Sequence, residues 1–171
     1  DALILPGVGS FDPAMKHLEN SMLIPYLKKW VKEDKPLLGI CLGLQLLFES
    51  SDEGNSKGLG LLKGHIQRLP NVEGERIPHM GWSPLIEEKL CPLIIQNGQE
   101  DWMYFVHSYS AIPLEQNDLA ASTNYGGNKI TAIVWKGRLG ACQFHPEKSA
   151  KTGHRMLARW IKWLEHGAKT H

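Results

Sequence analysis

The chain has 171 residues, of which 42% are apolar and 22% charged, a composition typical of a folded domain with a substantial core. Its 19 basic and 18 acidic residues are interspersed and give a formal net charge of +1, so charge offers no reason to expect a nucleic-acid or anionic-membrane partner. The longest apolar run, residues 37–48, is shorter than the roughly 20 residues that span a bilayer, and we expect neither a membrane span nor a signal segment.

The first predicted elements are a strand and a broken helix. The apolar run at residues 2–5, followed by "PGVGS", predicts a short buried strand that ends in a loop. Asp12 has the character of a helix N-cap, with Pro13 at the first helical position. Pro25 is expected to interrupt and restart this helical stretch, which ends near residue 34.

A second strand and helix follow at once. Residues 37–40 form an apolar run that predicts a buried strand, and after Cys41 the spacing of Leu44, Leu47 and Phe48 is helical. The order strand, helix, strand, helix predicts a three-layer α/β fold, with a mostly parallel sheet and helices on both faces.

The second half of the chain is predicted to be rich in antiparallel strands. Residues 50–64, with many Ser, Asp, Asn and Gly, predict a surface loop. Short apolar runs then predict strands at residues 66–69, 102–106, 119–123, 130–135 and 139–144. A C-terminal helix is predicted from one apolar face made of Met156, Leu157, Trp160, Ile161 and Leu164. Since no repeat or linker is found, residues 1–171 are expected to form a single domain.

The cysteines and histidines bear on location and on metals. Cys41, Cys91 and Cys142 are an odd number at wide spacing, which favours a reducing compartment and predicts a cytoplasmic protein without a disulfide framework. The eight histidines and three cysteines show no Cys-x-x-Cys or His-x-x-x-His spacing. We therefore expect no metal site and no cofactor.

A candidate nucleophile lies between the second strand and its helix. In Gly39-Ile40-Cys41-Leu42-Gly43 the cysteine has a glycine two residues to either side, the pattern of a sharp nucleophile turn. The following helix N-terminus is expected to lower the pKa of the thiol. Glycine spacing alone is a weak signal, and a buried, inert cysteine remains the alternative.

A candidate base lies in "QFHPEKS", residues 143–149. In extended backbone, His145 and Glu147 point to the same side, so the carboxylate can orient the imidazole. A cysteine nucleophile needs such an oriented base. An ordinary surface pair of His and Glu is the alternative.

The glycines of "PGVGS", residues 6–10, give a third candidate piece. They allow backbone N–H groups to turn toward a developing oxyanion. A phosphate-binding loop is disfavoured, because the Gly-x-x-x-x-Gly-Lys spacing is absent. An ordinary turn remains possible at this stage.

Taken in order, the motifs "LPGVGSF", "GICLGLQLLF", "PHMGWSPL", "YFVHSY" and "QFHPEKS" resemble the class I, or triad-type, glutamine amidotransferases. The resemblance covers essentially the whole chain and is greatest to the glutaminase subunits of imidazole glycerol phosphate synthase. It implies that Cys41 is the nucleophile, His145 the general base and acid, and Glu147 the residue that orients it. The implied oxyanion hole is made by Gly7, Val8, Gly9 and the backbone of Leu42.

The resemblance also implies the substrate, the partner and their contacts. Glutamine is hydrolysed to glutamate and ammonia, with Gln45, Tyr104, His107, Ser108 and Tyr109 near the substrate. The ammonia is channelled to a cyclase subunit with a (β/α)8 barrel, which makes imidazole glycerol phosphate and an aminoimidazole carboxamide ribotide in histidine biosynthesis. Trp82 and Lys148 match positions at the interface of this heterodimer, although core packing is the simpler interpretation of a tryptophan.

One departure from the family and two alternative functions stay open. Members of this family begin with a further strand and helix, including a Gly-Asn segment, so we expect both to be missing before Asp1 and the isolated chain to be poorly soluble. The same chemistry could serve a synthase for anthranilate, carbamoyl phosphate or guanylate. A catalytically silent assembly subunit on this scaffold is the other alternative.

Overall fold

The computed structural model describes residues 1–95 and 97–170. Its helices are α1 (Phe11–Asn20), α2 (Ile24–Lys32), α3 (Leu42–Leu46) and α4 (Ala150–Glu165), with short 3-10 helices η1 (Gln116–Asp118) and η2 (Pro146–Lys148). Its strands are β1 (Leu3–Leu5), β2 (Leu37–Ile40), β3 (Ser50–Ser51), β4 (Gly64–Arg68), β5 (His79–Pro84), β6 (Ile86–Glu87), β7 (Trp102–His107), β8 (Tyr109–Pro113), β9 (Leu119–Tyr125), β10 (Asn128–Lys136) and β11 (Leu139–Cys142).

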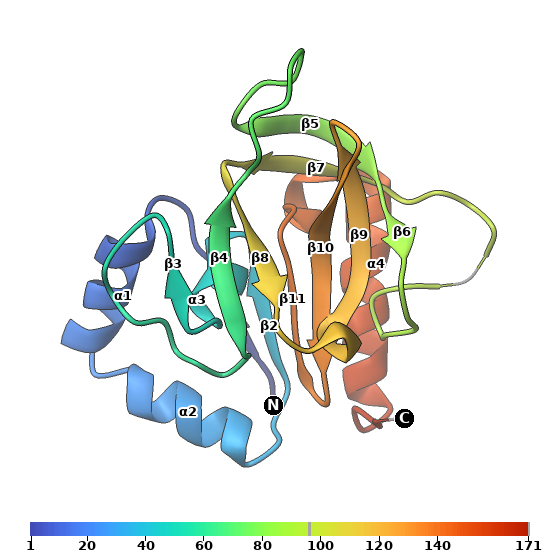
Figure 1. The fold of residues 1–171 in the computed structure, drawn as a ribbon. Helices are drawn as coiled ribbons and strands as arrows, with labels where there is room; N and C mark the ends of the chain where they lie inside the picture. Colours follow the sequence, from blue (N-terminus) through green and yellow to red (C-terminus); the bar gives the residue numbers. More distant parts are fainter. Residues whose placement is uncertain (96, 171) are drawn as a thin grey trace.

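The central sheet has the strand order β1-β2-β11-β10-β9-β6 (Figure 1). Strands β1, β2 and β11 pair in parallel, whereas β11, β10, β9 and β6 pair antiparallel. Tight turns join β9 to β10 and β10 to β11, and such hairpins can only be antiparallel. The predicted α/β class is confirmed, and its parallel part is confined to the three strands around β2.

Helices cover both faces of this sheet. Leu37 packs into an apolar cluster with side chains of α1, α2 and α3. Leu38 and Ile40, with the opposite orientation, pack with Met156 and Trp160 of α4. This alternation along a strand buried on both faces produces the predicted three layers.

Four strands, β3, β5, β6 and β8, were not predicted. Strand β5 pairs antiparallel with β7 in a separate two-stranded ribbon, and β8 pairs with β4. Gly81 and Pro84 interrupt the apolar pattern of β5, and its outward residues are themselves apolar, so no alternation of apolar and polar residues marks it. The predicted loop at residues 50–64 also contains the short strand β3.

Two local predictions about helices are wrong. Helix α1 begins at Phe11 after Ser10, and the Asp12 carboxylate accepts backbone N–H groups of Asn55 and Ser56, each at 2.9 Å, instead of capping the helix. These long-range bonds hold the loop after β3 against α1. In α4, Ile161 is 51% exposed and does not belong to the buried face that Met156 helps to form.

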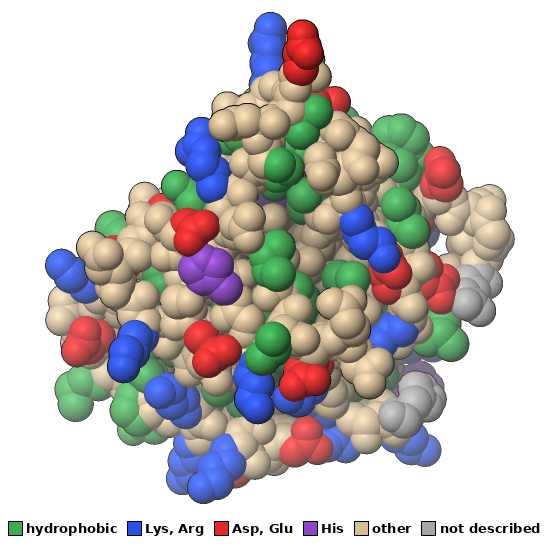
Figure 2. All heavy atoms as spheres, viewed as in Figure 1, with side chains coloured by type: hydrophobic (Ala, Val, Ile, Leu, Met, Phe, Trp, Pro, Cys, Tyr) green, Lys and Arg blue, Asp and Glu red, His purple; other side chains and the backbone are tan. Residues whose placement is uncertain are grey.

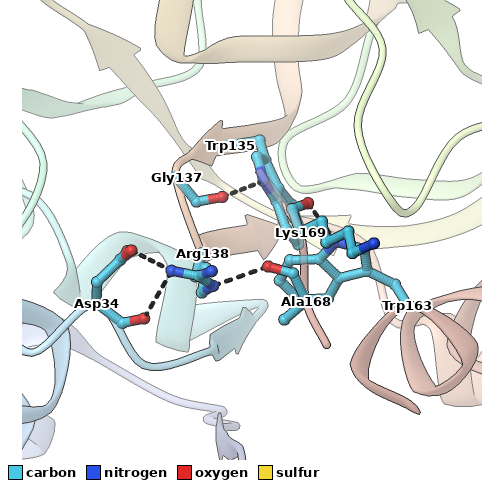
Figure 3. Close-up of polar contacts among 7 residues, drawn as sticks. All are labelled: Asp34, Trp135, Gly137, Arg138, Trp163, Ala168 and Lys169. Atoms are coloured by element: carbon cyan, nitrogen blue, oxygen red, sulfur yellow. Dashed lines mark hydrogen bonds and ion pairs between the residues drawn. The ribbon is translucent and has the colours of Figure 1, made fainter. Parts of the chain in front are cut away.

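Arg138, just before β11, joins three segments at the amino end of β2 and β11 (Figure 3). Its Nε donates to the carbonyl oxygen of Ala168 at 2.7 Å, and its guanidinium forms an ion pair with Asp34. Trp163 of α4 donates to the carbonyl of Lys169 at 3.0 Å in the same cluster. These contacts fasten the chain after α4 to the turn that enters β2.

The surface carries no region of one dominant charge in the view of Figure 2, where basic and acidic side chains are interspersed. Within residues 1–95 and 97–170, none of the helices is sufficiently long and apolar to cross a membrane.

Candidate active site

Cys41 occupies a strained turn at the carboxyl end of β2. Its backbone has φ 56° and ψ −112°, and its N–H donates to the carbonyl of Cys142 at 2.8 Å. A Cβ added to Gly43 would lie 1.8 Å from the carbonyl oxygen of Leu5, and one added to Gly39 would lie 3.1 Å from the carbonyl of Gly43. Only glycine fits at position 43, and a side chain at position 39 would require its neighbours to move by a few tenths of an ångström, which accounts for small residues on both sides of the cysteine.

His145 and Glu147 follow β11, the strand beside β2. The Nδ1 atom of His145 lies 2.6 Å from Oε1 of Glu147, so this nitrogen carries the proton and Nε2 is left as the basic atom. Tyr104 of β7 accepts the His145 backbone N–H at 3.0 Å. The Ser149 hydroxyl donates to the His145 carbonyl at 2.6 Å and accepts the Tyr104 N–H at 2.9 Å, so β7 holds the histidine in place.

A cavity of about 340 Å³ brings the candidate pieces together. It is lined by Val8, Gly9, Cys41, Leu42, Gln45, Glu53, Pro78, Val106, His107, Ser108, Tyr109, His145 and Lys148. Residues from six separate segments of the chain therefore face one space, among them the predicted nucleophile and base. Metal chemistry has no obvious ligand set here, because the described residues hold no group of three His, Cys, Asp or Glu side chains suited to an ion.

The electrostatics of Cys41 differ from the sequence expectation. Burial raises the pKa of its thiol above the ordinary value, and the Glu147 carboxylate raises it further. The Leu42 N–H and the Lys148 ammonium act in the opposite direction but do not prevail. Desolvation outweighs the favourable groups at the start of α3, so the expected net lowering of this pKa is wrong.

The glycine loop lies against the elbow in a closed arrangement. The Leu42 N–H, an expected oxyanion donor, donates to the carbonyl of Gly7 at 3.2 Å. Gly9 has φ +101°, which favours glycine, and the Val8 side chain is 77% exposed. The loop therefore occupies the donor that an oxyanion would need.

Gln45 is held by two acceptors that set the orientation of its amide. Its Nε2 donates to the carbonyl of Tyr109 and to Oε1 of Gln143, each at 3.2 Å. Both N–H groups are thereby used. Because Gln45 lines the cavity, Oε1 is the atom that it can offer to a ligand.

His107 is tied into a buried chain of polar groups. Its Nδ1 donates to the Tyr109 carbonyl at 2.9 Å, so its Nε2 accepts from Nδ1 of His79 at 3.0 Å. Nε2 of His79 in turn accepts from the Ser83 hydroxyl at 2.9 Å. Burial lowers the pKa of His107 to about 4 and also lowers that of His79, which keeps both rings neutral.

Of the three remaining predicted residues, Lys148 lines the cavity, whereas Tyr104 and Trp82 lie outside it. Tyr104 and Trp82 pair across the β5–β7 ribbon with ring centroids 6.0 Å apart, and neither lines the cavity. Lys148 lines it from η2. The structure thus separates Tyr104 from the other residues that the resemblance placed near substrate.

Two site residues were missed from the sequence. Glu53 lines the cavity, and its Oε1 accepts the N–H of Phe11 at 2.5 Å. Gln143 is fully buried between Gln45 and Cys41. Glu53 sat in a loop with no periodic pattern to mark it, whereas Gln143 stood inside the quoted motif and only its partners could show its position.

Comparisons with known proteins agree with these observations. The family model described as glutamine amidotransferase class-I matches residues 1–163. Imidazole glycerol phosphate synthase subunit HisH 2 of Prochlorococcus marinus (strain MIT 9313) is 69% identical over 169 residues, 99% of this chain and 79% of the relative. Subunit HisH of Synechococcus sp. (strain CC9605) is 60% identical with the same coverage.

Solved structures share the fold at lower identity. The structure titled "Structure of PurLQS from Thermotoga maritima" aligns with a TM-score of 0.70 and 21% identity over 95% of this chain and 79% of that chain. A second, titled "Crystal structure of glutamine amidotransferase", aligns with a TM-score of 0.67 and 23% identity over 92% of this chain and 78% of that chain.

Proposed function

Since this chain belongs to the class I glutamine amidotransferases, we propose that it is the glutaminase subunit of an imidazole glycerol phosphate synthase, the activity for which its HisH relatives are named. It hydrolyses glutamine and supplies the ammonia to a cyclase subunit, which makes imidazole glycerol phosphate and an aminoimidazole carboxamide ribotide in histidine biosynthesis. The observation that carries this proposal is a cysteine at a strained strand-to-helix turn that shares one cavity with a glutamate-bonded histidine.

The chemistry uses the three residues in named roles. His145 takes the thiol proton of Cys41, and the sulfur attacks the side-chain amide carbon of glutamine. The C–N bond breaks as His145 returns the proton to the departing ammonia, which leaves a γ-glutamyl thioester. Water, deprotonated by His145, then attacks the thioester carbon, and the C–S bond breaks as His145 returns the proton to the Cys41 sulfur, which releases glutamate. Glu147 holds the imidazole and stabilises its charged form.

The substrate is held by complementary groups of the cavity. Glutamine carries an α-ammonium group, and Glu53 is a carboxylate that lines the cavity and meets this positive charge. Oε1 of Gln45 accepts an N–H of the substrate. Ser108 and Tyr109 form the wall of the same cavity, and His107 contributes by fixing the Tyr109 carbonyl.

The oxyanion hole is completed only when the glycine loop moves. Leu42 donates its N–H to the tetrahedral oxyanion once the Gly7 carbonyl releases it, and the N–H groups of the Gly7–Gly9 loop turn toward the same position. One missing oxyanion donor costs about 10²–10³-fold in rate. The chain alone is therefore slow, and the partner with its ligand bound accelerates it by shifting this loop.

The outer face of the β5–β7 ribbon suits the cyclase partner, a (β/α)8-barrel subunit. Met80, Trp82 and Trp102 project from it with 62%, 48% and 46% of their surfaces exposed, an apolar cluster unusual for an unpartnered surface. The ribbon continues into Pro78 and Val106, which line the cavity, so ammonia formed there lies next to the interface. Lys148 reaches the same rim from η2.

The remaining assignments follow from this proposal. Residues 1–171 act as one glutamine amidotransferase domain that binds its partner as a heterodimer. Cys41, Cys91 and Cys142 are free and buried, which suits the reducing cytoplasm where biosynthesis of amino acids takes place.

The test is glutamate release from glutamine by the purified chain, with and without a purified cyclase-type barrel subunit and its ribonucleotide ligand. The wild-type chain is expected to release glutamate with the partner about 10²–10³-fold faster than alone. Cys41→Ser is expected to abolish release in both cases. Release that survives this substitution would overturn the proposal.

A further inference from the structure

We propose that Gln143 is a further catalytic residue, because its amide N–H is aimed at the nucleophilic sulfur and its carbonyl oxygen fixes the amide of Gln45. The catalytic role of Gln143 rests on the proposed function, whereas its contacts with Cys41 and Gln45 do not depend on it. Nε2 of Gln143 lies 3.9 Å from Sγ of Cys41, and the Gln143 side chain is completely buried.

The Tyr109 carbonyl sets the donor and acceptor roles in the hydrogen bonds that link it to Gln45, Gln143 and Cys41. The Tyr109 carbonyl can only accept, so the Gln45 atom beside it is the amide nitrogen. That nitrogen also faces Gln143, whose atom there is consequently the oxygen. The other end of the Gln143 amide, the N–H donor, is then turned to Cys41. The orientation follows from the neighbours and does not depend on the cysteine.

An N–H aimed at sulfur favours the thiolate over the thiol, because hydrogen bonds to a charged acceptor are the stronger ones. The thiolate needs such stabilisation at this site, because burial raises the pKa of Cys41. The other charged and titratable groups around the sulfur are His145, Glu147 and Lys148 from η2 and its N-cap, Cys142 at the end of β11, and Glu53 across the cavity. Substitution of Gln143 leaves these groups in place.

The same amide joins substrate binding to the nucleophile. Gln45 keeps Oε1 toward the cavity only while Nε2 has two acceptors, and Gln143 supplies one of them. Loss of Gln143 therefore affects both the reactivity of Cys41 and the amide that receives glutamine. Loss of Gln45 affects mainly the second.

The experiment compares Gln143→Met with Gln45→Met, two substitutions of similar size and shape. The rate of Cys41 alkylation by iodoacetamide is followed against pH on the full chain, with Cys41→Ser as the blank. Cys91 and Cys142 stay silent because both are buried and burial raises the pKa of each thiol, to about 11 for Cys91. Melting curves verify that each variant is folded.

Gln143→Met is expected to move the alkylation midpoint up by about one pH unit, which means about tenfold slower alkylation below the midpoint. With the cyclase partner, its kcat for glutamine falls about tenfold. Gln45→Met is expected to raise KM and to move the midpoint less than Gln143→Met does, because it removes the contact that orients the Gln143 amide but keeps the Gln143 N–H. A Gln143→Met profile that coincides with wild type would overturn the inference, even if glutaminase activity is present. A shifted midpoint in a chain that releases no glutamate would instead uphold the contact and refute the proposed function.

A measurement on the wild-type chain covers the case in which Gln143→Met does not fold. The side-chain amide resonance of Gln143 is expected to titrate with the alkylation midpoint of Cys41 and to stay constant in Cys41→Ser. An amide resonance that does not respond to ionisation of the cysteine would overturn the inference.

Discussion

The two ends of β2 carry polar clusters of opposite kinds. At the amino end, Arg138 binds Asp34 and Ala168, and these groups satisfy one another (Figure 3). At the carboxyl end, the bonds of Gln45 leave its Oε1 facing a cavity, beside Cys41. A closed cluster can only hold the chain together, whereas an open cluster has groups left for a ligand.

Backbone strain alone does not distinguish the two ends. Asp34, before β2, has φ 55°, and Cys41, after it, has φ 56°. Aspartate adopts this region readily, and here its carboxylate is paired with Arg138, whereas cysteine does so rarely. The strained residue of functional interest is the one whose side chain faces an open cavity.

Glu147→Gln is expected to give the largest loss at the carboxyl end. The substitution keeps the shape of the side chain but removes the charge that stabilises the His145 imidazolium. The rate of glutamate release should fall on the order of 10⁴-fold, with an unchanged melting temperature. Glu165→Gln, at the end of α4, is the control and should have no effect. Wild-type turnover in Glu147→Gln would show that the Glu147 charge does not assist His145.

Low pH should lower the free energy of unfolding, because the buried histidines near the carboxyl end of β2 are neutral in the folded chain. The pKa of His107 is about 4 in the folded chain against an ordinary value of 6.5, so the unfolded chain binds the proton first. Stability is therefore unaffected above pH 6.5 and falls as the pH drops from 6.5 to 4, by up to about 3 kcal/mol. Urea unfolding of His107→Asn across this window should show a shallower decline than wild type.

The control for this prediction is His17→Asn, at an exposed position on α1. Its unfolding free energy should follow the wild-type curve at every pH. If His107→Asn also runs parallel to wild type, His107 is not the group that makes the carboxyl end acid-sensitive.

Glu53→Gln should separate binding from structure at the cavity. Glutamine keeps an oxygen for the Phe11 N–H but lacks the charge that meets the substrate ammonium. KM for glutamine is expected to rise about 10–100-fold. Glu49→Gln is the matched control, because Glu49 also accepts a backbone N–H, from Gly64 at 2.9 Å, but does not line the cavity. Equal effects of the two substitutions on KM would contradict the assignment.

Arg138→Met should produce the smallest effect and only on stability. It removes the bonds to Asp34 and Ala168 at a partly exposed site, which should lower the unfolding free energy by about 1–2 kcal/mol. Glutaminase turnover per folded molecule should not change. Arg155→Met, at an exposed position of α4, serves as the control. A loss of turnover without a loss of stability would contradict the assignment of a purely structural role to the Arg138 cluster.

Much of the site was predictable because its residues lie next to strand ends. The apolar run before Cys41 and the one before His145 each predicted a strand, and the two strands are neighbours with parallel register in the sheet. Groups at the carboxyl ends of adjacent parallel strands meet at one edge. Sequence order and glycine spacing made Cys41 and His145 candidates, the family resemblance assigned their roles, and the structure places both at one cavity.

The rest depended on contacts between segments far apart in the chain. Glu53 reaches the cavity through a loop whose position is fixed by bonds from Asp12, and Asp12 was predicted instead to cap its own helix. Strand β5 was missed because glycine and proline interrupt it and its outward face is apolar. The raised pKa of Cys41 follows from desolvation by segments far apart in the chain, which no local pattern could predict.

The central claim is that Cys41, in this cavity, is the nucleophile that attacks glutamine. A diazoketone analogue of glutamine alkylates such a cysteine irreversibly, and mass spectrometry of the digested chain locates the adduct. We expect one adduct, on Cys41, whose formation is slowed by excess glutamine and is abolished in Cys41→Ser. An adduct on Cys91 or Cys142, or labelling of Cys41 that glutamine does not slow, would contradict the account.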